Sequence, residues 1–242
     1  MGAVGNAYLV LYNVVQFLGW SHMLYILLPH LDAALVKGVD RGQLYSDIEL
    51  SVKVFQTAAV LEVVHAAVGL VKTNPMLAMF QVSSRVFVVW AILDAVPESR
   101  LCRGLPLLLI AWIITEMIRY SFYAVGLLGT SLYFITWLRF ISFYIYIFPL
   151  ESWSVIILRY TLFFALYPIG VTGELWCCYV SLARVARDKL FTWTMPNSLN
   201  MTFNFYYVLI AIMLSYIPLF PQLYFHMIAQ RKKVIGGHKK TA

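Results

Sequence analysis

Tyr167 and Glu174 are residues of types that exchange protons, and both lie in one long apolar stretch. Seven positions correspond to about 700° of helical rotation, so a helix would carry both side chains on one face, about 10.5 Å apart along its axis. A carboxyl group in an apolar site can exchange protons near neutral pH, and a tyrosine hydroxyl can donate a proton to a departing hydroxyl. The pair therefore suits proton-transfer chemistry that needs no metal. The same spacing also occurs where a tyrosine merely packs and an acid is merely paired.

Further ionisable residues interrupt the apolar stretches. Each costs at least a few kcal/mol at the centre of a bilayer, so such groups normally face a polar interior and pair with one another. Glu116 and Arg119 are three positions apart and can pair on one helix, and Glu62 and His65 have the same spacing. Each residue alone is equally consistent with a structural ion pair. Together they predict a polar cavity, typical of a transporter, a channel or an enzyme for lipid-like substrates; they are Glu62, His65, Arg85, Glu116, Arg119, Arg139, Arg159 and Glu174.

The composition explains why these charges stand out. Of the 242 residues, 62% are apolar and only 12% are charged, which is about half the usual charged share of a soluble domain. So few charged residues cannot cover so much apolar surface in water. The composition therefore excludes a water-soluble enzyme, a disordered tail and a nucleic-acid-binding module. It indicates an integral membrane protein.

The hydropathy pattern predicts an all-α fold, a polytopic transmembrane helical bundle that forms one domain over residues 1–242. A span needs about 20 mostly apolar residues. Short polar connections, such as 29–49 and 96–104, separate the candidates. The candidate spans are 7–28, 52–71, 76–95, 105–128, 132–150 and/or 154–182, and 205–228.

The net charge of +7 is concentrated near the end of the chain, in a basic tail over residues 229–242. This arrangement indicates membrane topology rather than a nucleic-acid partner. With an even number of spans, the basic tail predicts that the N- and C-termini are both cytosolic. Lys239 and Lys240 stand where a dilysine retrieval signal of the endoplasmic reticulum would be, and we favour this interpretation over a solvated basic tail.

Several long motifs resemble the very-long-chain (3R)-3-hydroxyacyl-CoA dehydratase family, formerly called protein-tyrosine-phosphatase-like A. They are YLVLYNVVQFLGW, VFQTAAVLEVVHAAVGLVKTNPMLAMFQVSSRVFVVW, TEMIRYSFYAVGLL, RYTLFFALYPIGVTGEL and LSYIPLFPQLYFHMIAQRKK. The resemblance covers nearly the whole chain, and we expect plant members to be the most similar. It implies a six-span enzyme of the endoplasmic reticulum membrane.

The resemblance implies the third step of fatty-acid elongation, the loss of water from a long-chain (3R)-3-hydroxyacyl-CoA to give the trans-2-enoyl-CoA. The family's catalytic residues fall on Tyr167 and Glu174. One would act as the acid and the other as the base, and the sequence leaves open which residue has which role. Other recurrent family positions fall on Arg85, Glu116, Arg119 and Tyr120, where we expect supporting roles. Membrane lipid and other elongation enzymes are the implied partners, and no cofactor or metal is expected.

The older phosphatase name can be tested on chemistry. A cysteine phosphatase needs a thiolate and, six positions later, an arginine that holds the phosphate. Here Ala66 stands at the first position and Lys72 at the second. Alanine has no sulfur, and lysine lacks the bidentate fork of arginine. Phosphatase chemistry at this segment is therefore excluded.

The sequence departs from the family pattern at residues 140–159. The segment FISFYIYIFPLESWSVIILR separates Trp137-Leu138-Arg139 from Tyr160, and the Leu-Arg pair recurs at 158–159. Its removal would leave 222 residues in an uninterrupted family pattern. We interpret it as an in-frame insertion, from a retained intron or an alternative splice form. The alternatives to an active dehydratase are then a catalytically impaired isoform that serves as a subunit of the elongation complex and, on buried charge alone, a transporter.

Overall fold

The computed structural model describes residues 3–37, 39, 41–128, 152–197 and 200–238. All of the regular structure in these residues is helical apart from one isolated bridge between Trp193 and Phe203. The helices are α1 (Ala3–Leu31), α2 (Arg41–Ala58), α3 (Val60–Ala67), α4 (Pro75–Phe87), α5 (Pro97–Arg100), α6 (Gly104–Leu128), α8 (Ser152–Asp188) and α9 (Phe205–His238), with two π-helical segments, η1 (Asp32–Lys37) and η2 (Val88–Asp94).

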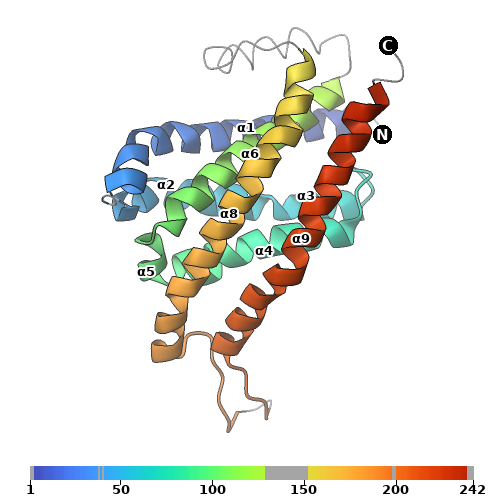
Figure 1. Cartoon of the computed structure of the whole chain (residues 1–242). Helices are drawn as coiled ribbons and strands as arrows, with labels where there is room; N and C mark the ends of the chain where they lie inside the picture. Colours follow the sequence, from blue (N-terminus) through green and yellow to red (C-terminus); the bar gives the residue numbers. More distant parts are fainter. Residues whose placement is uncertain (1–2, 38, 40, 129–151, 198–199, 239–242) are drawn as a thin grey trace.

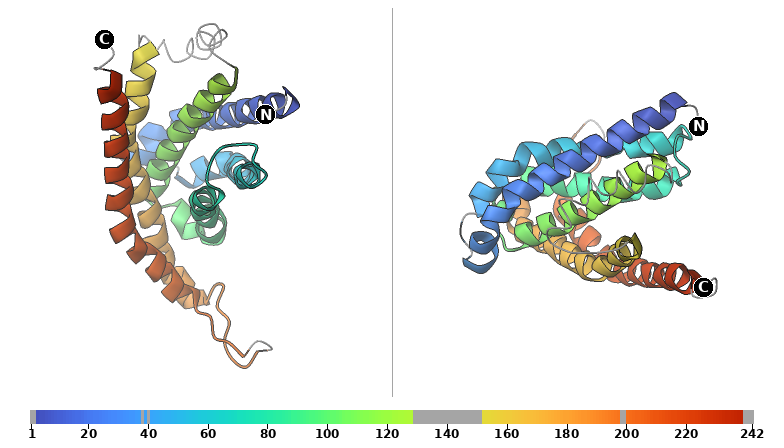
Figure 2. Two further views of the ribbon diagram at one scale, coloured as in Figure 1. Left: turned by 90° about the vertical axis from the view of Figure 1, so that its right-hand side faces the viewer. Right: turned by 90° about the horizontal axis from the view of Figure 1, so that it is seen from above.

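Helix α6 occupies the middle of the bundle. It packs against α1 on one side and against α8 on the other, while α9 packs mainly along α8 (Figure 1). Figure 2 shows α8 and α9 as a pair that stands apart from the group formed by α1 to α4. The beginning of α1 and the end of α9 lie toward the same end of the bundle. Residues on α6 can therefore contact both halves of the molecule.

The predicted membrane spans agree with the helices in most places. In the part of the chain that the structure describes, four helical stretches are long and apolar enough to cross a membrane, namely Ala3–Leu35, Arg41–Ala67, Gly104–Leu127 and Phe205–Gln222. The predicted span 76–95 is helical as α4 and η2. The predicted alternative 154–182 lies within α8, whereas 132–150 lies outside the described residues. The chain is thus a multi-pass membrane protein with an all-α fold.

The polar connection predicted over 29–49 is wrong, because helical structure fills most of it. Segment η1 extends α1 to Lys37, and α2 begins at Arg41. The charges of this region find partners within the bundle: Lys53 pairs with Glu49 at 2.6 Å and with Asp94. Charged side chains that pair with one another do not have to be exposed to water, so this polar segment can form a helix.

Helix α4 begins where sequence rules place a helix start. The Asn74 side chain accepts a hydrogen bond from the Met76 backbone N–H at 3.0 Å, and Pro75 takes the first helical position, where no donor is needed. The preceding turn contains Gly69 with φ of 74°, in the left-handed region that glycine adopts freely. This turn lets α3 and α4 pack side by side.

Glycines allow α6 and α8 to approach closely. A Cβ atom on Gly173 would lie 2.6 Å from the Leu108 backbone nitrogen, and one on Gly104 would lie 2.7 Å from the Gly173 carbonyl oxygen. Small residues at such a crossing bring two backbones together, as is common between membrane helices. The crossing fixes the position of the residue that follows Gly173, which is Glu174.

We expect Gly173→Ala to lower the free energy of unfolding by about 1–3 kcal/mol, because α6 and α8 must separate to admit the methyl group. Gly126→Ala is the matched control, since a Cβ atom there meets nothing within 4 Å and alanine favours a helix. Thermal unfolding in detergent measures both. Equal stability of the two variants would contradict the close crossing.

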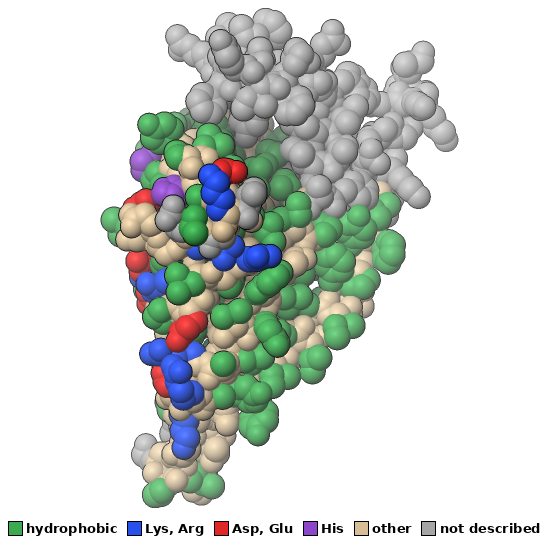
Figure 3. All heavy atoms as spheres, turned by 60° about the vertical axis from the view of Figure 1, so that its left-hand side comes forward, with side chains coloured by type: hydrophobic (Ala, Val, Ile, Leu, Met, Phe, Trp, Pro, Cys, Tyr) green, Lys and Arg blue, Asp and Glu red, His purple; other side chains and the backbone are tan. Residues whose placement is uncertain are grey.

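The surface of the bundle suits a lipid environment. Apolar side chains cover wide areas in Figure 3, while the charged side chains gather mostly along one edge. Helix α9 contributes much of this apolar surface through exposed Tyr207, Leu214, Ile217, Leu219 and Phe225. Where α5 contacts α8, Arg184 Nη1 lies 3.0 Å from Glu98 Oε1. A hydrogen bond from its own backbone N–H, together with Arg184, keeps the pKa of the Glu98 carboxyl below its usual value.

Candidate active site

One face of α6 carries the polar groups of the candidate site. Its members recur at intervals of four and three residues, which brings them to the same side of a helix. Trp112, Glu116 and Tyr120 are all buried within the bundle. Arg119 completes the face and is about one fifth exposed. Because α6 is central, this face meets residues from α1, α3, α4 and α8.

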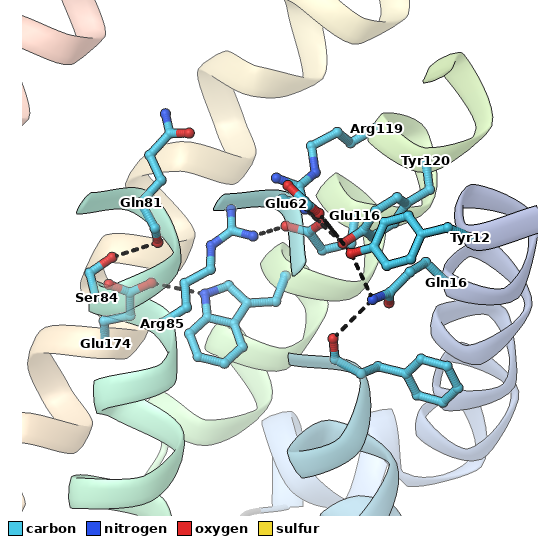
Figure 4. A network of polar contacts seen from close by, with 12 residues as sticks. Tyr12, Gln16, Glu62, Gln81, Ser84, Arg85, Glu116, Arg119, Tyr120 and Glu174 are labelled. Atoms are coloured by element: carbon cyan, nitrogen blue, oxygen red, sulfur yellow. Dashed lines mark hydrogen bonds and ion pairs between the residues drawn. The ribbon is translucent and has the colours of Figure 1, made fainter. Parts of the chain in front are cut away.

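Glu116 is the most deeply buried acid of the site, with 1% of its side chain exposed. It forms an ion pair with Arg85 of α4 and another with Arg119, whose Nη2 lies 2.6 Å from Glu116 Oε2. Figure 4 shows the two arginines approaching the carboxylate from different directions. The predicted local pairing of Glu116 with Arg119 is confirmed, and the carboxylate is shared with a second helix.

Glu62 of α3 is the second acid of the network. Its Oε1 accepts hydrogen bonds from Arg119 at 2.8 Å and from the Tyr120 hydroxyl at 2.5 Å. The Tyr12 hydroxyl of α1 also donates to this oxygen, at 3.4 Å, and in turn accepts from Gln16 at 3.2 Å (Figure 4). The network therefore ties α1, α3, α4 and α6 together through two carboxylates and two guanidinium groups of balanced charge.

The predicted pairing of Glu62 with His65 is wrong. Nε2 of His65 lies 2.9 Å from the Tyr8 hydroxyl, and the His65 ring meets the Tyr8 and Tyr12 rings edge to face. Glu62 instead pairs with Arg119, because a permanent guanidinium charge stabilises a buried carboxylate better than a neutral imidazole does. His65 belongs to an aromatic cluster beside the network.

Glu174 lies where α8 meets both α6 and α9. Its Oε1 accepts a hydrogen bond from Trp112 Nε1 at 2.8 Å, and its Oε2 accepts one from the Tyr216 hydroxyl at 2.7 Å. Trp112 lies one turn before Glu116 on α6, so its bond places Glu174 beside the face that carries the network.

Tyr167 lies two turns before Glu174 on the same helix, as the spacing predicted, and is half-buried. Its ring stacks on Phe220, with centroids 5.1 Å apart and planes 11° apart, and on Tyr224, with centroids 6.4 Å apart. Tyr216 and Phe220 are one turn apart on α9, so a single face of α9 contacts both Glu174 and Tyr167.

The structure thus brings four of the predicted residues, Arg85, Glu116, Arg119 and Tyr120, into a single network. Glu174 bonds to Trp112 on the same face of α6, whereas Tyr167 contacts aromatic residues of α9. Sequence reasoning did not single out Trp112, Tyr216 or the pair formed by Tyr12 and Gln16. The four-residue spacing of Trp112 and Glu116 was available as a signal, whereas Tyr216 is one of many aromatic residues near the end of the chain. Arg139 and the side chain of Arg159 lie outside the described residues.

The polar groups at this site include types that can exchange protons, a tyrosine hydroxyl and carboxylates. Within the described residues, no group of three or more histidine, cysteine, aspartate or glutamate side chains is arranged to hold a metal ion. Cys102, Cys177 and Cys178 are buried free thiols, and the Cys102 and Cys177 sulfur atoms are 3.5 Å apart.

Comparison with known proteins identifies the family. The model described as "Protein tyrosine phosphatase-like protein, PTPLA" matches residues 56–154 and 146–237. A Caenorhabditis elegans protein, very-long-chain (3R)-3-hydroxyacyl-CoA dehydratase hpo-8, is 47% identical over 236 residues, which cover 97% of each chain. The chain belongs to the very-long-chain 3-hydroxyacyl-CoA dehydratase (PTPLA) family. No solved structure matches it.

The prediction that plant members of the dehydratase family are the most similar to this chain is wrong. Human very-long-chain (3R)-3-hydroxyacyl-CoA dehydratase 2 is 44% identical over 240 residues, covering 98% of this chain and 85% of the human one. The Arabidopsis thaliana dehydratase PASTICCINO 2 is only 34% identical over 241 residues, covering 99% of this chain and 98% of the plant one. The chain is therefore more similar to these animal dehydratases than to the plant protein.

Proposed function

We infer that this chain removes water from a long-chain (3R)-3-hydroxyacyl-CoA to give the trans-2-enoyl-CoA, the third step of very-long-chain fatty-acid elongation. The observation that carries this inference is the identity of 44% and 47% to named dehydratases over almost the whole chain. The geometry supports it, because an acid and a hydroxyl on one face of α8 meet a common face of α9.

Tyr167 and Glu174 are the proposed catalytic residues. The thioester carbonyl makes the C2 proton acidic, and a base removes it. The electron pair of the C2–H bond forms the C2=C3 double bond, and the C3–O bond breaks as an acid protonates the leaving hydroxyl to water. Catalysis by positioned acids and bases contributes about 10²- to 10⁴-fold in rate. No metal or redox cofactor is required for this balance.

Arg85, Glu116, Arg119 and Tyr120 are proposed to support the site rather than to transfer protons. Their ion pairs and hydrogen bonds engage one another, which leaves them little freedom to protonate or deprotonate a substrate. They hold α4 and α6 together and keep this part of the bundle interior polar. An acyl-CoA thioester is polar at its reacting end and apolar along its acyl chain. Such a molecule suits a site in which charged groups lie near the membrane lipid.

We further propose six crossings of the endoplasmic reticulum membrane, by α1, α2–α3, α4–η2, α6, α8 and α9. An even number places both termini on one side, and the basic end of the chain places that side in the cytosol. The start of α1 and the end of α9 lie toward the same end of the bundle, which supports this arrangement (Figure 1). The proposed partners are membrane lipid and other elongation enzymes; Lys239 and Lys240, the proposed retrieval signal, lie outside the described residues.

Residues 140–159 are proposed to be an insertion. The family model supports this, since it matches in two stretches, 56–154 and 146–237, that meet inside this segment. Most of the segment lies outside the described residues, and its last eight residues form the start of α8. Helix α8 has 37 residues, about 55 Å in length, well beyond the roughly 30 Å that a bilayer core requires.

A chain that lacks 140–159 should be at least as active as the full chain, because the contacts that join Tyr167 and Glu174 to Trp112 of α6 and to Tyr216 and Phe220 of α9 involve no residue of the segment. Those contacts are made with the segment present, which favours an active enzyme over an impaired subunit. Activity assays of both forms and sequencing of the expressed message measure this. Messages that always encode 140–159, together with an inactive deletion variant, would contradict the insertion.

The function itself is tested with the purified full chain in detergent. The chain should convert a (3R)-3-hydroxyacyl-CoA to the trans-2-enoyl-CoA, detected by mass spectrometry, and should leave the (3S) enantiomer largely unchanged. Absence of enoyl product from folded protein across a series of acyl chain lengths would overturn the proposed function.

A further inference from the structure

The two oxygens of the Glu174 carboxylate are held from two different helices. Trp112 of α6 donates its indole N–H to Oε1 at 2.8 Å, and Tyr216 of α9 donates its hydroxyl to Oε2 at 2.7 Å. An indole N–H can only donate, so at least this bond requires the oxygen of Glu174 to be an acceptor. An ionised carboxylate accepts at both oxygens, and the observed arrangement matches that form.

Both donors are neutral, and this distinguishes Glu174 from the other two acids. Glu116 and Glu62 are paired with arginines at the distances given above. Among the described residues, no lysine, arginine or histidine nitrogen lies within 4.0 Å of the Glu174 carboxylate. The two hydrogen bonds therefore hold the carboxylate as an acceptor at both oxygens without a salt bridge.

The carboxylate also keeps capacity for a substrate. Two oxygens offer about four lone-pair positions, and the two hydrogen bonds occupy one on each oxygen. The remaining positions can receive the C2 proton. Tyr216 lies one turn from Phe220, which stacks on Tyr167, so the same helix face that holds Glu174 also supports the ring of the second catalytic residue.

We propose that Trp112 and Tyr216 are positioning residues for the dehydration, which hold Glu174 ionised and in one orientation so that it acts as the base, with Tyr167 as the acid. This proposal rests on the proposed function. In the step, the C2 proton passes to Glu174 and the Tyr167 proton passes to the leaving hydroxyl. Return of the proton from Glu174 to Tyr167 restores both groups.

The test is the pH dependence of kcat/KM for dehydration in Tyr216→Phe and Trp112→Phe. Loss of either donor makes the carboxylate harder to ionise, so the acidic limb of the profile should move to higher pH by about one unit. The rate at neutral pH should fall about tenfold, with a smaller change in KM. A residue that serves only packing would lower the rate without moving the limb.

Matched controls remove the same chemical group elsewhere. Tyr207→Phe deletes a hydroxyl from α9 at a side chain that is 68% exposed. Trp90→Phe deletes an indole N–H that donates to Thr57 at 3.0 Å, away from Glu174. Both controls should keep the wild-type pH profile. An acidic limb that moves equally in the controls and in the site variants would overturn the proposal.

A second measurement does not depend on activity. Infrared difference spectra between wild type and Glu174→Gln should show no carboxylic-acid C=O band from Glu174 at neutral pH, and on acidification this band should appear at a higher pH in the Tyr216→Phe background than in the wild type. A carboxylic-acid band from Glu174 in the wild type at neutral pH would overturn the proposal even if a variant folds poorly.

The failure of this proposal can be told from the failure of the proposed function. If Glu174→Gln is inactive but Tyr216→Phe and Trp112→Phe keep the acidic limb of the wild-type pH profile, only the positioning role fails. Full activity of Glu174→Gln would instead contradict the proposed function of Glu174.

Discussion

Replacing Glu174 with glutamine should lower the kcat for dehydration by roughly 10²- to 10⁴-fold, the range that a general base contributes. Glutamine has nearly the same size and can still accept the hydrogen bond from Tyr216, but it cannot take up the C2 proton. Steady-state formation of the enoyl-CoA by the purified variant measures the loss. We expect KM to change little, because the carboxylate acts on the reacting carbon rather than on the long acyl chain.

Glu98→Gln provides the control for this substitution. Its side chain is 42% exposed and pairs with Arg184 at the contact of α5 with α8, remote from Tyr167 in sequence and in contacts. The same change of a carboxylate to an amide should leave kcat within about twofold, because exposed ion pairs contribute little. A Glu174→Gln variant that folds like the wild type and keeps its kcat would remove Glu174 from the mechanism.

Replacing Glu116 with glutamine should destabilise the protein by about 3 kcal/mol, near the lower end of the effect of breaking a buried ion pair. Glu116 is 1% exposed and is paired with both Arg85 and Arg119, so its loss leaves two guanidinium groups without their shared carboxylate. The partial exposure of both arginines moderates the cost. Thermal or denaturant unfolding in detergent measures the change in free energy.

The ion-pair explanation for Glu116 can be separated from a simple loss of packing. The double variant Glu116→Leu with Arg85→Met removes the first pair and leaves Arg119 bound to Glu62 at 2.8 Å. We expect it to be more stable than Glu116→Gln, because replacing both partners by apolar groups removes the unpaired charge. A double variant less stable than the single one would show that unpaired charge does not cause the loss of stability in Glu116→Gln.

The sequence predicted the class of the fold and the general placement of its helices. Apolar runs of about 20 residues locate α1, α6 and α9 closely, because lipid imposes a length on any crossing. The boundaries of α2 were less predictable: the charges of 29–49 indicated a polar connection, but α2 begins at Arg41, and Glu49 pairs with Lys53 one turn later on the same helix. Charge pairing across helices is a tertiary effect that a hydropathy window does not contain.

The candidate site was predictable only in part, because some of its contacts depend on how the helices pack. Tyr167 and Glu174 could be placed on one helix face from their spacing, since both depend only on helical geometry. Trp112 and Tyr216 come from helices distant in sequence, and only the packing of α6 and α9 against α8 brings them to Glu174. His65 failed as a partner of Glu62 because a local spacing was outweighed by Arg119, 57 residues away.

The most direct test of this account compares purified wild-type chain with the double variant Tyr167→Phe, Glu174→Gln on a (3R)-3-hydroxyacyl-CoA. Both proteins should unfold at similar temperatures, since the substitutions keep side-chain size. The wild type should form the trans-2-enoyl-CoA at least 10²-fold faster than the double variant, roughly the least expected from loss of an acid or a base. A wild-type rate no greater than that of the double variant would contradict the assignment of dehydration to these two residues.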